Sequence, residues 1–264
     1  MESPKIDYIQ SKDNKTIKHI ISLQQRKYRQ KFGEYTVEGI RAVTDIGKKD
    51  CLRSILIRES KRSELEPLVE KGFTISSVYV VQDPIFDKIE HSVNGQGILG
   101  IAKKCVNDLH SLIVEDGLYV ALDGVQDPGN LGTIIRTAVA AGAKGIFLLK
   151  GTVDPYNEKC VRSTMSALCN IPIFEDVTLS EFYDFIKDNT IKTYVTSLEN
   201  AKPYHTISYP KRTMIILGNE GNGVSREIIE MCDQAITIPM YGDIESLNVS
   251  IAAALCMYKV REQI

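Results

Sequence analysis

The stretch 117-GLYVALDGVQDPGNLGTIIRTAVAAG-142 decides the fold of this chain. Its apolar run 118–122 is continuous rather than alternating, which is typical of a parallel strand buried on both faces. The turn signal 127–129 follows, and Asn130 is a good N-cap for an apolar helix that we expect to end at Gly142. A strand, a turn and a helix in this order predict an α/β unit.

The same alternation continues to the C-terminus, and it predicts a parallel sheet with helices on both faces over residues 118–264. We expect further strands at 144–149, 192–198, 213–218 and 235–240. We expect further helices at 157–170, 179–189, 223–232 and 246–264. Sheets of this kind bind ligands beyond the carboxyl ends of their strands, so the loops that leave the strands are the candidate functional segments.

Residues 1–104 form a smaller α/β unit by the same criteria, and residues 105–117 begin without a strong apolar pattern, which indicates a linker. In the smaller unit we expect helices at 15–31, from Ile40 onward, at 63–72 with Gly72 as its end, and at 83–91. We expect its strands at 33–37, 53–59, 76–81 and 95–104.

Length and composition exclude several classes of protein. The chain has 264 residues, of which 43% are hydrophobic and 25% charged, as is ordinary for a globular protein. No apolar run approaches the roughly 18 residues that a membrane helix needs. Residues 1–15 lack the apolar core of a secretory signal. We therefore expect a cytoplasmic protein that does not cross a membrane.

The cysteines predict no metal site. They are Cys51, Cys105, Cys160, Cys169, Cys232 and Cys256. No two of them form a C-x-x-C pair, and the four histidines do not cluster near them in the sequence. We expect free and mostly buried thiols in a reducing compartment, with no bound metal.

The formal net charge of -2 conceals an asymmetry between the two units. Basic residues outnumber acidic ones by 19 to 15 in residues 1–110, whereas acidic residues outnumber basic ones by 19 to 13 in residues 111–264. The basic excess is sharpest at 12–31, where Asp13 is the only acidic residue. This segment suits contact with nucleic-acid phosphates, and a solvated helix face is the other interpretation.

Two of the predicted strand exits carry unusual residues. Arg136 stands inside an otherwise apolar helix, where a buried guanidinium would need an anionic or hydrogen-bonding partner. An internal salt bridge or a snorkelling surface side chain is the alternative. The second exit, 216-ILGNEGNGVS-225, crowds glycines around Glu220. It does not fit the dinucleotide pattern G-x-G-x-x-G, and a plain glycine-rich turn is the alternative to a functional loop.

The third exit is 238-IPMYGDIESLNVSIAAAL-255, in which Pro239 and Gly242 break the chain directly after a strand. Ser246 and Asn248 then open a helix rich in alanine. These two polar side chains are candidates for the site, and a simple N-cap is the alternative for Ser246.

Taken together, these exits resemble the signature motifs of a known family. The stretches N-L-G-x-x-x-R, L-G-N-E-G-x-G and I-P-M-x-G-x-x-x-S-L-N-V-S are similar, in this order, to those of the SpoU/TrmH RNA ribose 2'-O-methyltransferases of the SPOUT class. The resemblance covers residues 118–261. The segment 157–173 resembles the family's next helix, with Arg162 in place and with Thr164 and Ser166 where the family often has Ser and Gly.

The N-terminal unit resembles the accessory RNA-binding domain of many family members, a small α/β/α sandwich. The matching pieces are Ser11, Asn14, Ile17, Lys18, the basic stretch 26–29, the segment 37–39 and the segment 96–100. The resemblance therefore implies the domain order RNA substrate-binding domain 1–104, linker 105–117 and SPOUT methyltransferase domain 118–264.

The resemblance further implies a deep trefoil knot whose loops bind S-adenosylmethionine, and a homodimer formed through the knotted helix at 247–261. The implied cofactor contacts are Thr196, Leu217, Gly218, Asn219, Gly221, Ile238, Met240 and Leu247. The implied catalytic residues are Asn130, Arg136, Glu220, Ser246 and Asn248. The implied RNA contacts are Lys12, Lys15, Lys18, Arg26, Lys27, Arg29, Arg41 and Arg162.

The implied reaction moves a methyl group from a sulfonium to a ribose 2'-oxygen and needs no metal. Orientation of the oxygen and loss of its proton are the enzyme's tasks. Arg136 occupies the position for which proton removal is proposed in the family. A guanidinium, whose pKa exceeds about 12, is a poor base. We favour bidentate anchoring of the adjacent phosphate as its role, and the sequence alone leaves both roles open.

Other functions stay open at this point. Ribosomal RNA is the expected substrate, and transfer RNA is the alternative. A catalytically inactive RNA-binding module of the same fold is a second alternative, although the intact polar motif residues argue against it. A nicotinamide-dependent oxidoreductase is a third, but 123-DGVQDPGNLG-132 lacks the glycine fingerprint that a dinucleotide loop requires.

Overall fold

The computed structural model describes residues 6–69, 75–92 and 95–264. Contacts within the chain divide it into two compact units. One unit comprises residues 1–105 together with 156–169, and the other comprises residues 106–155 together with 170–264. No helix in the described part of the chain is long and apolar enough to cross a membrane.

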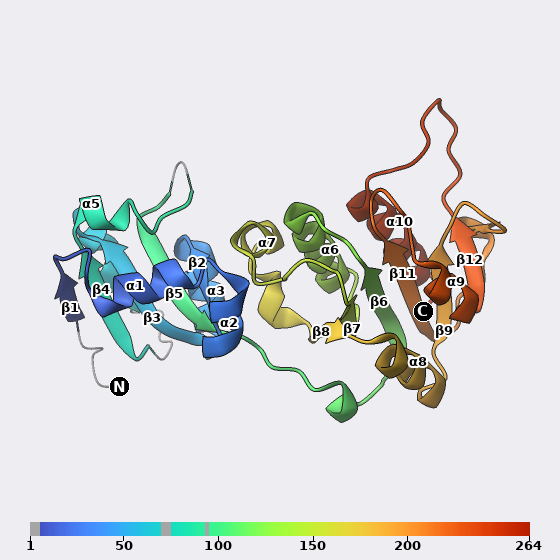
Figure 1. The fold of residues 1–264 in the computed structure, drawn as a ribbon, viewed down its shortest axis with the longest axis horizontal. Helices are drawn as coiled ribbons and strands as arrows, with labels where there is room; N and C mark the ends of the chain where they lie inside the picture. Colours follow the sequence, from blue (N-terminus) through green and yellow to red (C-terminus); the bar gives the residue numbers. More distant parts are fainter. Residues whose placement is uncertain (1–5, 70–74, 93–94) are drawn as a thin grey trace. The chain divides into compact units, whose positions relative to one another are not determined.

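A seven-stranded sheet forms the centre of the second unit (Figure 1). Its strands are, in spatial order, β10 (Lys202–Pro203), β12 (Gln234–Thr237), β9 (Lys192–Thr196), β11 (Arg212–Gly218), β6 (Gly117–Asp123), β7 (Gly145–Leu149) and β8 (Ile173–Val177). Every pair of neighbours is parallel. The predicted parallel sheet is therefore confirmed, and the strands β8 and β10 are additional to those that the sequence pattern predicted.

Helices cover both faces of this sheet, which explains why its strands lack apolar alternation. On one face, Phe182, Phe185 and Ile228 join a buried cluster with strand residues such as Phe147. They come from α8 (Leu179–Asp188) and α9 (Arg226–Met231). On the other face, α6 (Pro128–Ala140) and α10 (Val249–Arg261) pack against each other, and α10 also contacts β11 and β6. The unit also contains the 3₁₀ helices η2 (Leu109–Ser111) and η4 (Tyr204–Thr206).

Three expected helix boundaries are wrong. The cap of α6 is Asp127, whose side chain accepts a hydrogen bond from the Asn130 amide, so Asn130 lies within the first turn and is not the N-cap. Helix α10 is capped by Asn248 and not by Ser246. The helix predicted at 157–170 breaks into α7 (Glu158–Thr164) and the 3₁₀ helix η3 (Ala167–Asn170), because the backbone is left-handed at Met165 and Ser166.

The first unit is built on a five-stranded mixed sheet (Figure 1). The strand order is β1 (Ile6–Ile9), β4 (Ser77–Val81), β3 (Leu52–Arg58), β5 (Ile98–Lys103) and β2 (Glu34–Glu38). Strands β1, β4 and β3 are mutually parallel, whereas β5 is antiparallel to both of its neighbours. Strand β1 was not predicted from the sequence.

The helices of the first unit are α1 (Lys15–Ser22), α2 (Arg26–Phe32), α3 (Ile40–Gly47), η1 (Glu59–Glu64), α4 (Leu65–Val69), α5 (Asp83–Phe86) and α7. Ile17, Ile20 and Phe86, from α1 and α5, are buried together against strand residues. The single helix predicted at 15–31 is wrong, since the chain breaks between α1 and α2. Gly72, the expected end of the helix at 63–72, lies outside the described residues.

The cysteines differ from expectation in one respect. None of the six forms a disulfide. Only Cys160 and Cys256 are buried, however, and the other four are partly accessible, so the expectation of mostly buried thiols is wrong. Cys51, Cys105 and Cys232 lie outside the helices and strands, and the other three lie in α7, η3 and α10.

Candidate functional site

The three strand exits singled out in the sequence lie along one edge of the second unit's sheet. Parallel pairing aligns Gly218 at the end of β11 with Asp123 at the end of β6. It likewise aligns Thr196 at the end of β9 with Ile236 in β12. Because β12, β9, β11 and β6 are consecutive neighbours, the loops that follow them emerge side by side.

The glycine-rich loop after β11 closes on itself. Asn219 and Gly223 exchange two backbone hydrogen bonds, at 2.9 and 3.0 Å. The Asn219 side chain accepts hydrogen bonds from the amides of Gly221 and Asn222 at 2.8 and 3.0 Å. It also donates to the carbonyl of Gly124, in the loop after β6, at 2.8 Å. The loop is thus a small fixed hairpin that is tied to the neighbouring strand exit.

Gly218 is required by the close approach of this hairpin. A Cβ atom at this position would lie 2.2 Å from the carbonyl carbon of Gly223 and 2.3 Å from the amide nitrogen of Val224. Both of these are backbone atoms, which cannot rotate away. Only glycine lets β11 run directly into the loop here.

A polar network joins residues from all three exits. Asn130 Nδ2 in α6 donates to Glu220 Oε1 at 2.9 Å. Asn248 Nδ2 donates to Asn130 Oδ1 at 3.0 Å. Asn248 Oδ1 in turn accepts from the amide of Ser250 at 2.9 Å, which caps α10. Each amide side chain therefore uses its oxygen and its nitrogen on different partners, which fixes its orientation.

Glu220 is the anionic member of this network. Burial by itself would raise the pKa of Glu220, but the hydrogen bond from Asn130 and those from the backbone outweigh it, so that the pKa lies below its ordinary value. Glu220 is consequently a carboxylate at neutral pH. It is suited to orienting amide donors and is unsuited to giving up a proton.

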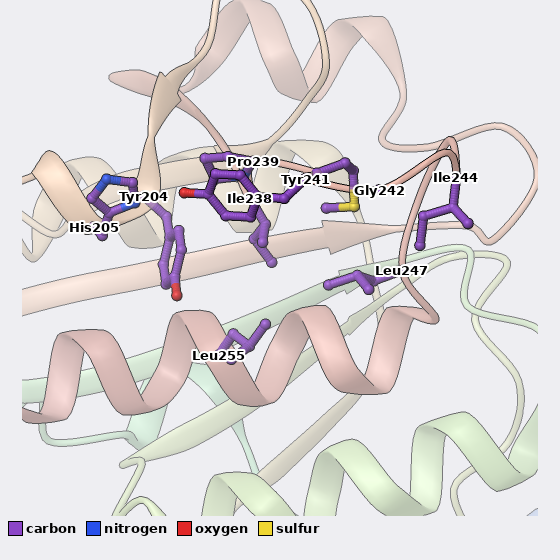
Figure 2. A pocket seen from close by; sticks show the side chains of 10 residues that line it. Tyr204, His205, Ile238, Pro239, Tyr241, Gly242, Ile244, Leu247 and Leu255 are labelled. Carbon is purple, nitrogen blue, oxygen red and sulfur yellow. The ribbon is translucent and has the colours of Figure 1, made fainter.

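A cavity of about 370 Å³ lies beside this network, between α10 and the segment after β12. Its lining is mostly apolar and is supplied by Tyr204, His205, Ile238, Pro239, Met240, Tyr241, Gly242, Ile244, Leu247 and Leu255. Figure 2 shows Leu255 pointing from α10 into the cavity, with Ile238 and Tyr204 above it. Leu247 directly precedes Asn248, so the chain itself connects the cavity to the polar network.

The cavity contains three of the residues implied as cofactor contacts, namely Ile238, Met240 and Leu247. The others do not line it. Thr196, Leu217, Gly218, Asn219 and Gly221 lie at or just after the ends of β9 and β11. Tyr204, His205 and Leu255 were not predicted as site residues. No motif marks the segment that holds Tyr204 and His205, and Leu255 has the spacing of an ordinary apolar helix residue.

Comparisons with known proteins identify the family of the chain. The sequence profile described as the SpoU rRNA Methylase family matches residues 117–258. The chain belongs to this family. A second profile, the MRM3-like substrate binding domain, matches residues 14–100. The resemblance drawn from the motifs is thereby confirmed.

Individual family members cover almost the whole chain. It is 32% identical over 256 residues to a Bacillus subtilis protein named 23S rRNA (guanosine(2553)-2'-O)-methyltransferase RlmP, with 96% of this chain and 98% of that protein aligned. Its fold is similar to that of an AdoMet-bound rRNA methyltransferase from Sinorhizobium meliloti, with a TM-score of 0.86 and 30% identity over 97% of this chain and 98% of that one. A structure described as an RNA 2'-O ribose methyltransferase is similar over the same shares, with a TM-score of 0.82 and 26% identity.

Two motif residues of this SpoU family chain stay outside the polar network. Arg136 is exposed on α6, so the idea that it is buried in an apolar helix is wrong. Within the described residues it has no carboxylate partner, and its guanidinium is open to a ligand. Ser246 is exposed in the segment before α10, where its side chain makes no hydrogen bond to the described part of the chain.

Seven of the eight basic residues expected to contact RNA remain candidates, and Arg29 does not. Lys12, Lys15, Lys18, Lys27 and Arg41 are exposed on the first unit. The same unit holds Arg26, which is half-buried, and Arg162, which pairs with Glu158 within α7. These side chains remain candidates for phosphate contacts.

Arg29 is different, and its assignment as an RNA contact is corrected. The residue is only 4% exposed, and its Nη1 donates to the carbonyls of Leu23 and Gln24 at 2.7 and 2.8 Å. These carbonyls lie where α1 ends, so Arg29 stabilises the break between α1 and α2. Its position in a run of lysines and arginines concealed this role.

Proposed function

We propose that this SpoU family chain transfers a methyl group from S-adenosylmethionine to a ribose 2'-hydroxyl of ribosomal RNA. The observation that carries the proposal is the hydrogen-bonded network of Asn130, Glu220 and Asn248 next to an apolar cavity. The names of the relatives support the substrate class, since two of them are rRNA methyltransferases and one of these is AdoMet-bound. The site residues are part of this proposal.

The cavity fits a molecule with a flat apolar portion and polar ends. Ile238, Leu247 and Leu255 offer apolar contacts suited to an adenine ring. The close turn at Gly218 leaves backbone groups rather than side chains at the neighbouring strand end, where polar parts of a ligand can bind. When bound, S-adenosylmethionine supplies a methyl group activated by its sulfonium.

The chain's own residues position the RNA. Arg136 is exposed and unpaired within the described residues, so we assign it to bidentate binding of the phosphate next to the target ribose. Its positive charge also favours the oxyanion that develops at the 2'-oxygen. Asn130 and Asn248 hold the strand exits in place, and Ser246 is free to donate to the ribose or the cofactor.

The C-terminal helix supports both a knot and a dimer. Helix α10 follows β12, which pairs with β9, yet it packs on β11, β6 and α6. At its end, Gln263 accepts from the Tyr209 amide at 2.9 Å and donates to the Ile207 carbonyl at 3.0 Å. The loop before β11 thus borders the helix end, and this proximity is compatible with a knot at the C-terminus.

Helix α10 also presents an exposed apolar stripe of Ile251, Leu255 and Tyr258, which are 51%, 38% and 49% exposed. A second copy of the chain would cover this stripe in a homodimer. The dimer would bring groups of both subunits to each site, as the family resemblance implies.

We assign RNA recognition to an α/β/α sandwich at 1–104, followed by a linker at 105–117 and the methyltransferase domain at 118–264, although the segment 156–169 groups with the first unit by its contacts. The match of residues 14–100 to a substrate binding domain supports this division. A polar hollow on the first unit includes Lys15 and Lys103, which suit phosphate contacts, beside an ion pair of Arg53 with Glu34 at 2.9 Å. The cytoplasmic location stays a prediction.

Methyl transfer from labelled S-adenosylmethionine to RNA that lacks its own modifications tests the proposal. We expect a 2'-O-methylated nucleoside in rRNA, and we expect Arg136→Ala to lower the rate at least about 100-fold. The matched control is Arg212→Ala at the opposite end of β11, whose surface ion pair with Asp116 contributes little. A base-methylated product, or transfer to tRNA alone, would contradict the assigned product or substrate. Intact cofactor binding without transfer to any RNA would favour the inactive RNA-binding module.

A further inference from the structure

Three cysteines that are far apart in the sequence converge in the first unit. Cys51 precedes β3, Cys105 follows β5, and Cys169 lies in η3. Their Sγ atoms all lie within 4.8 Å of one another. Those of Cys51 and Cys105 are 4.0 Å apart. All three residues are half-buried, so the cluster is shielded by protein but is reachable from solvent.

The spacing of the sulfur atoms matches that of a ligand set. A zinc–sulfur bond of about 2.3 Å in tetrahedral geometry places two sulfur ligands about 3.8 Å apart, and trigonal geometry places them about 4.0 Å apart. The distance between Cys51 and Cys105 falls in this range, and the third thiol needs only a small rotation to reach it. A disulfide, by contrast, needs a separation of about 2.05 Å.

The surroundings act differently on the three thiols: burial raises the pKa of Cys51, the hydrogen bond to Cys169 raises that of Cys105, and the pKa of Cys169 is lowered. The hydrogen bond from the Cys105 thiol lowers the pKa of Cys169 to about 6; burial opposes this effect, and the Tyr35 hydroxyl, 3.4 Å away, adds to it. Lys49 also acts on Cys169 with its positive charge. Metal ions bind thiolates rather than thiols, so binding at this cluster would release the thiol protons.

We propose that Cys51, Cys105 and Cys169 bind a thiophilic divalent cation, such as Zn²⁺, through three thiolates, with a water molecule in the fourth position. The cation would replace three thiol protons and would join the start of β3, the end of β5 and η3. This site does not depend on the proposed methyltransferase function. Its test is therefore independent of any activity assay.

The test uses the full-length chain, reduced and freed of metal with a chelator. Titration with Cd²⁺ should produce a sulfur-to-cadmium charge-transfer band in the ultraviolet that saturates at one equivalent. Competition between the protein and a chromogenic chelator should show that Zn²⁺ binds at the same stoichiometry. One equivalent of Zn²⁺ should also raise the midpoint of thermal unfolding.

The near-isosteric variant Cys169→Ser should weaken Zn²⁺ binding by at least about tenfold and abolish the metal-dependent shift in unfolding temperature. Cys51→Ser should do the same from a different segment, which guards against a folding defect peculiar to one variant. Cys232→Ser is the matched control, because its thiol lies outside the cluster, and it should bind as the unaltered chain does. Absence of stoichiometric binding would overturn the proposal. The proposal would also be overturned if Cys169→Ser bound Zn²⁺ as tightly as the unaltered chain. The same holds if the reduced chain took up no metal and Cys51 and Cys105 instead formed a disulfide on oxidation.

Discussion

Replacing Gly218 by alanine tests whether the close approach at the end of β11 holds the candidate site together. The added Cβ would lie 2.2 Å from the carbonyl carbon of Gly223 and 2.3 Å from both its oxygen and the amide nitrogen of Val224. Ordinary carbon contacts begin near 3.5 Å, so the backbone of the hairpin must move by on the order of 1 Å.

The cost of this movement follows from the contacts that it disturbs. Overpacking against a rigid neighbour costs about 1–3 kcal/mol. Weakening the two backbone hydrogen bonds between Asn219 and Gly223 adds on the order of 1 kcal/mol. We therefore expect a loss of about 3 kcal/mol in the free energy of unfolding, which corresponds to a fall of about 6–12 °C in the unfolding midpoint of the second unit.

Activity should fall with stability, because the displaced hairpin carries Glu220, the hydrogen-bond acceptor of Asn130. We expect methyl transfer to drop by at least about tenfold at a temperature where the variant is folded. Scanning calorimetry measures the midpoint, and a filter assay with labelled S-adenosylmethionine measures the transfer rate.

Gly221→Ala is the matched control in the same hairpin. Its added Cβ would meet only the Asn219 side-chain oxygen at 3.5 Å, an ordinary contact, so its unfolding midpoint should stay within about 2 °C of the unaltered chain. The reasoning is refuted if Gly218→Ala unfolds at the original temperature. It is also refuted if the two variants lose equal stability, since hairpin flexibility rather than close approach would then be the cause.

Three further predictions test the structure, two of them with a matched control substitution. Ser166 has a φ of 71°, a left-handed conformation that glycine adopts without strain. Ser166→Gly should therefore raise the free energy of unfolding by roughly 1 kcal/mol in urea titrations. The control Ser163→Gly, inside α7, should lower it by a similar amount. Arg29→Ala should cost about 2–3 kcal/mol, because the buried carbonyl of Leu23 and the partly buried carbonyl of Gln24 lose this donor. Lys27→Ala, in contrast, should spare stability and reduce the salt dependence of RNA binding, measured by filter retention. Burial raises the pKa of Asp233, but hydrogen bonds from the start of β9 outweigh it and hold the pKa below its ordinary value. The carboxylate therefore stabilises the fold above about pH 4 and loses this effect as the pH falls through its lowered pKa. Asp233→Asn should consequently be less stable than the unaltered chain near pH 7. Urea titrations should show equal stability of the two near pH 2.

Local chemistry explains why so much of the second unit could be predicted from the sequence. A strand buried on both faces is continuously apolar, as residues 118–122 are, and several such runs alternating with helices favour a parallel sheet covered by helices. The three motifs likewise mark strand exits, although the sequence does not say how far apart these exits lie in space. Their order and spacing were enough to identify the family.

Helix breaks were not predictable in the same way. The apolar stripe that predicted the helix at 15–31 lies in its first half, at Ile17, Ile20 and Leu23, and the polar residues 24–31 are compatible with a helix without showing whether the backbone is continuous. The left-handed residues Met165 and Ser166 are of types that rarely adopt this conformation, so no local signal announced the break. Strand β10, with two residues, is too short to carry a pattern at all.

The sequence by itself determined the alternation of strands and helices, the parallel sheet and the identity of the polar residues at its edge, because these depend on burial and on the chemistry of neighbouring residues. Tertiary structure alone decided which of those residues meet. Asn130, Glu220 and Asn248 form one network because strand order places their loops side by side, while Arg136 stays exposed. Convergence of three distant cysteines likewise depends on how β3, β5 and η3 pack, and spacing along the chain carries no record of that packing.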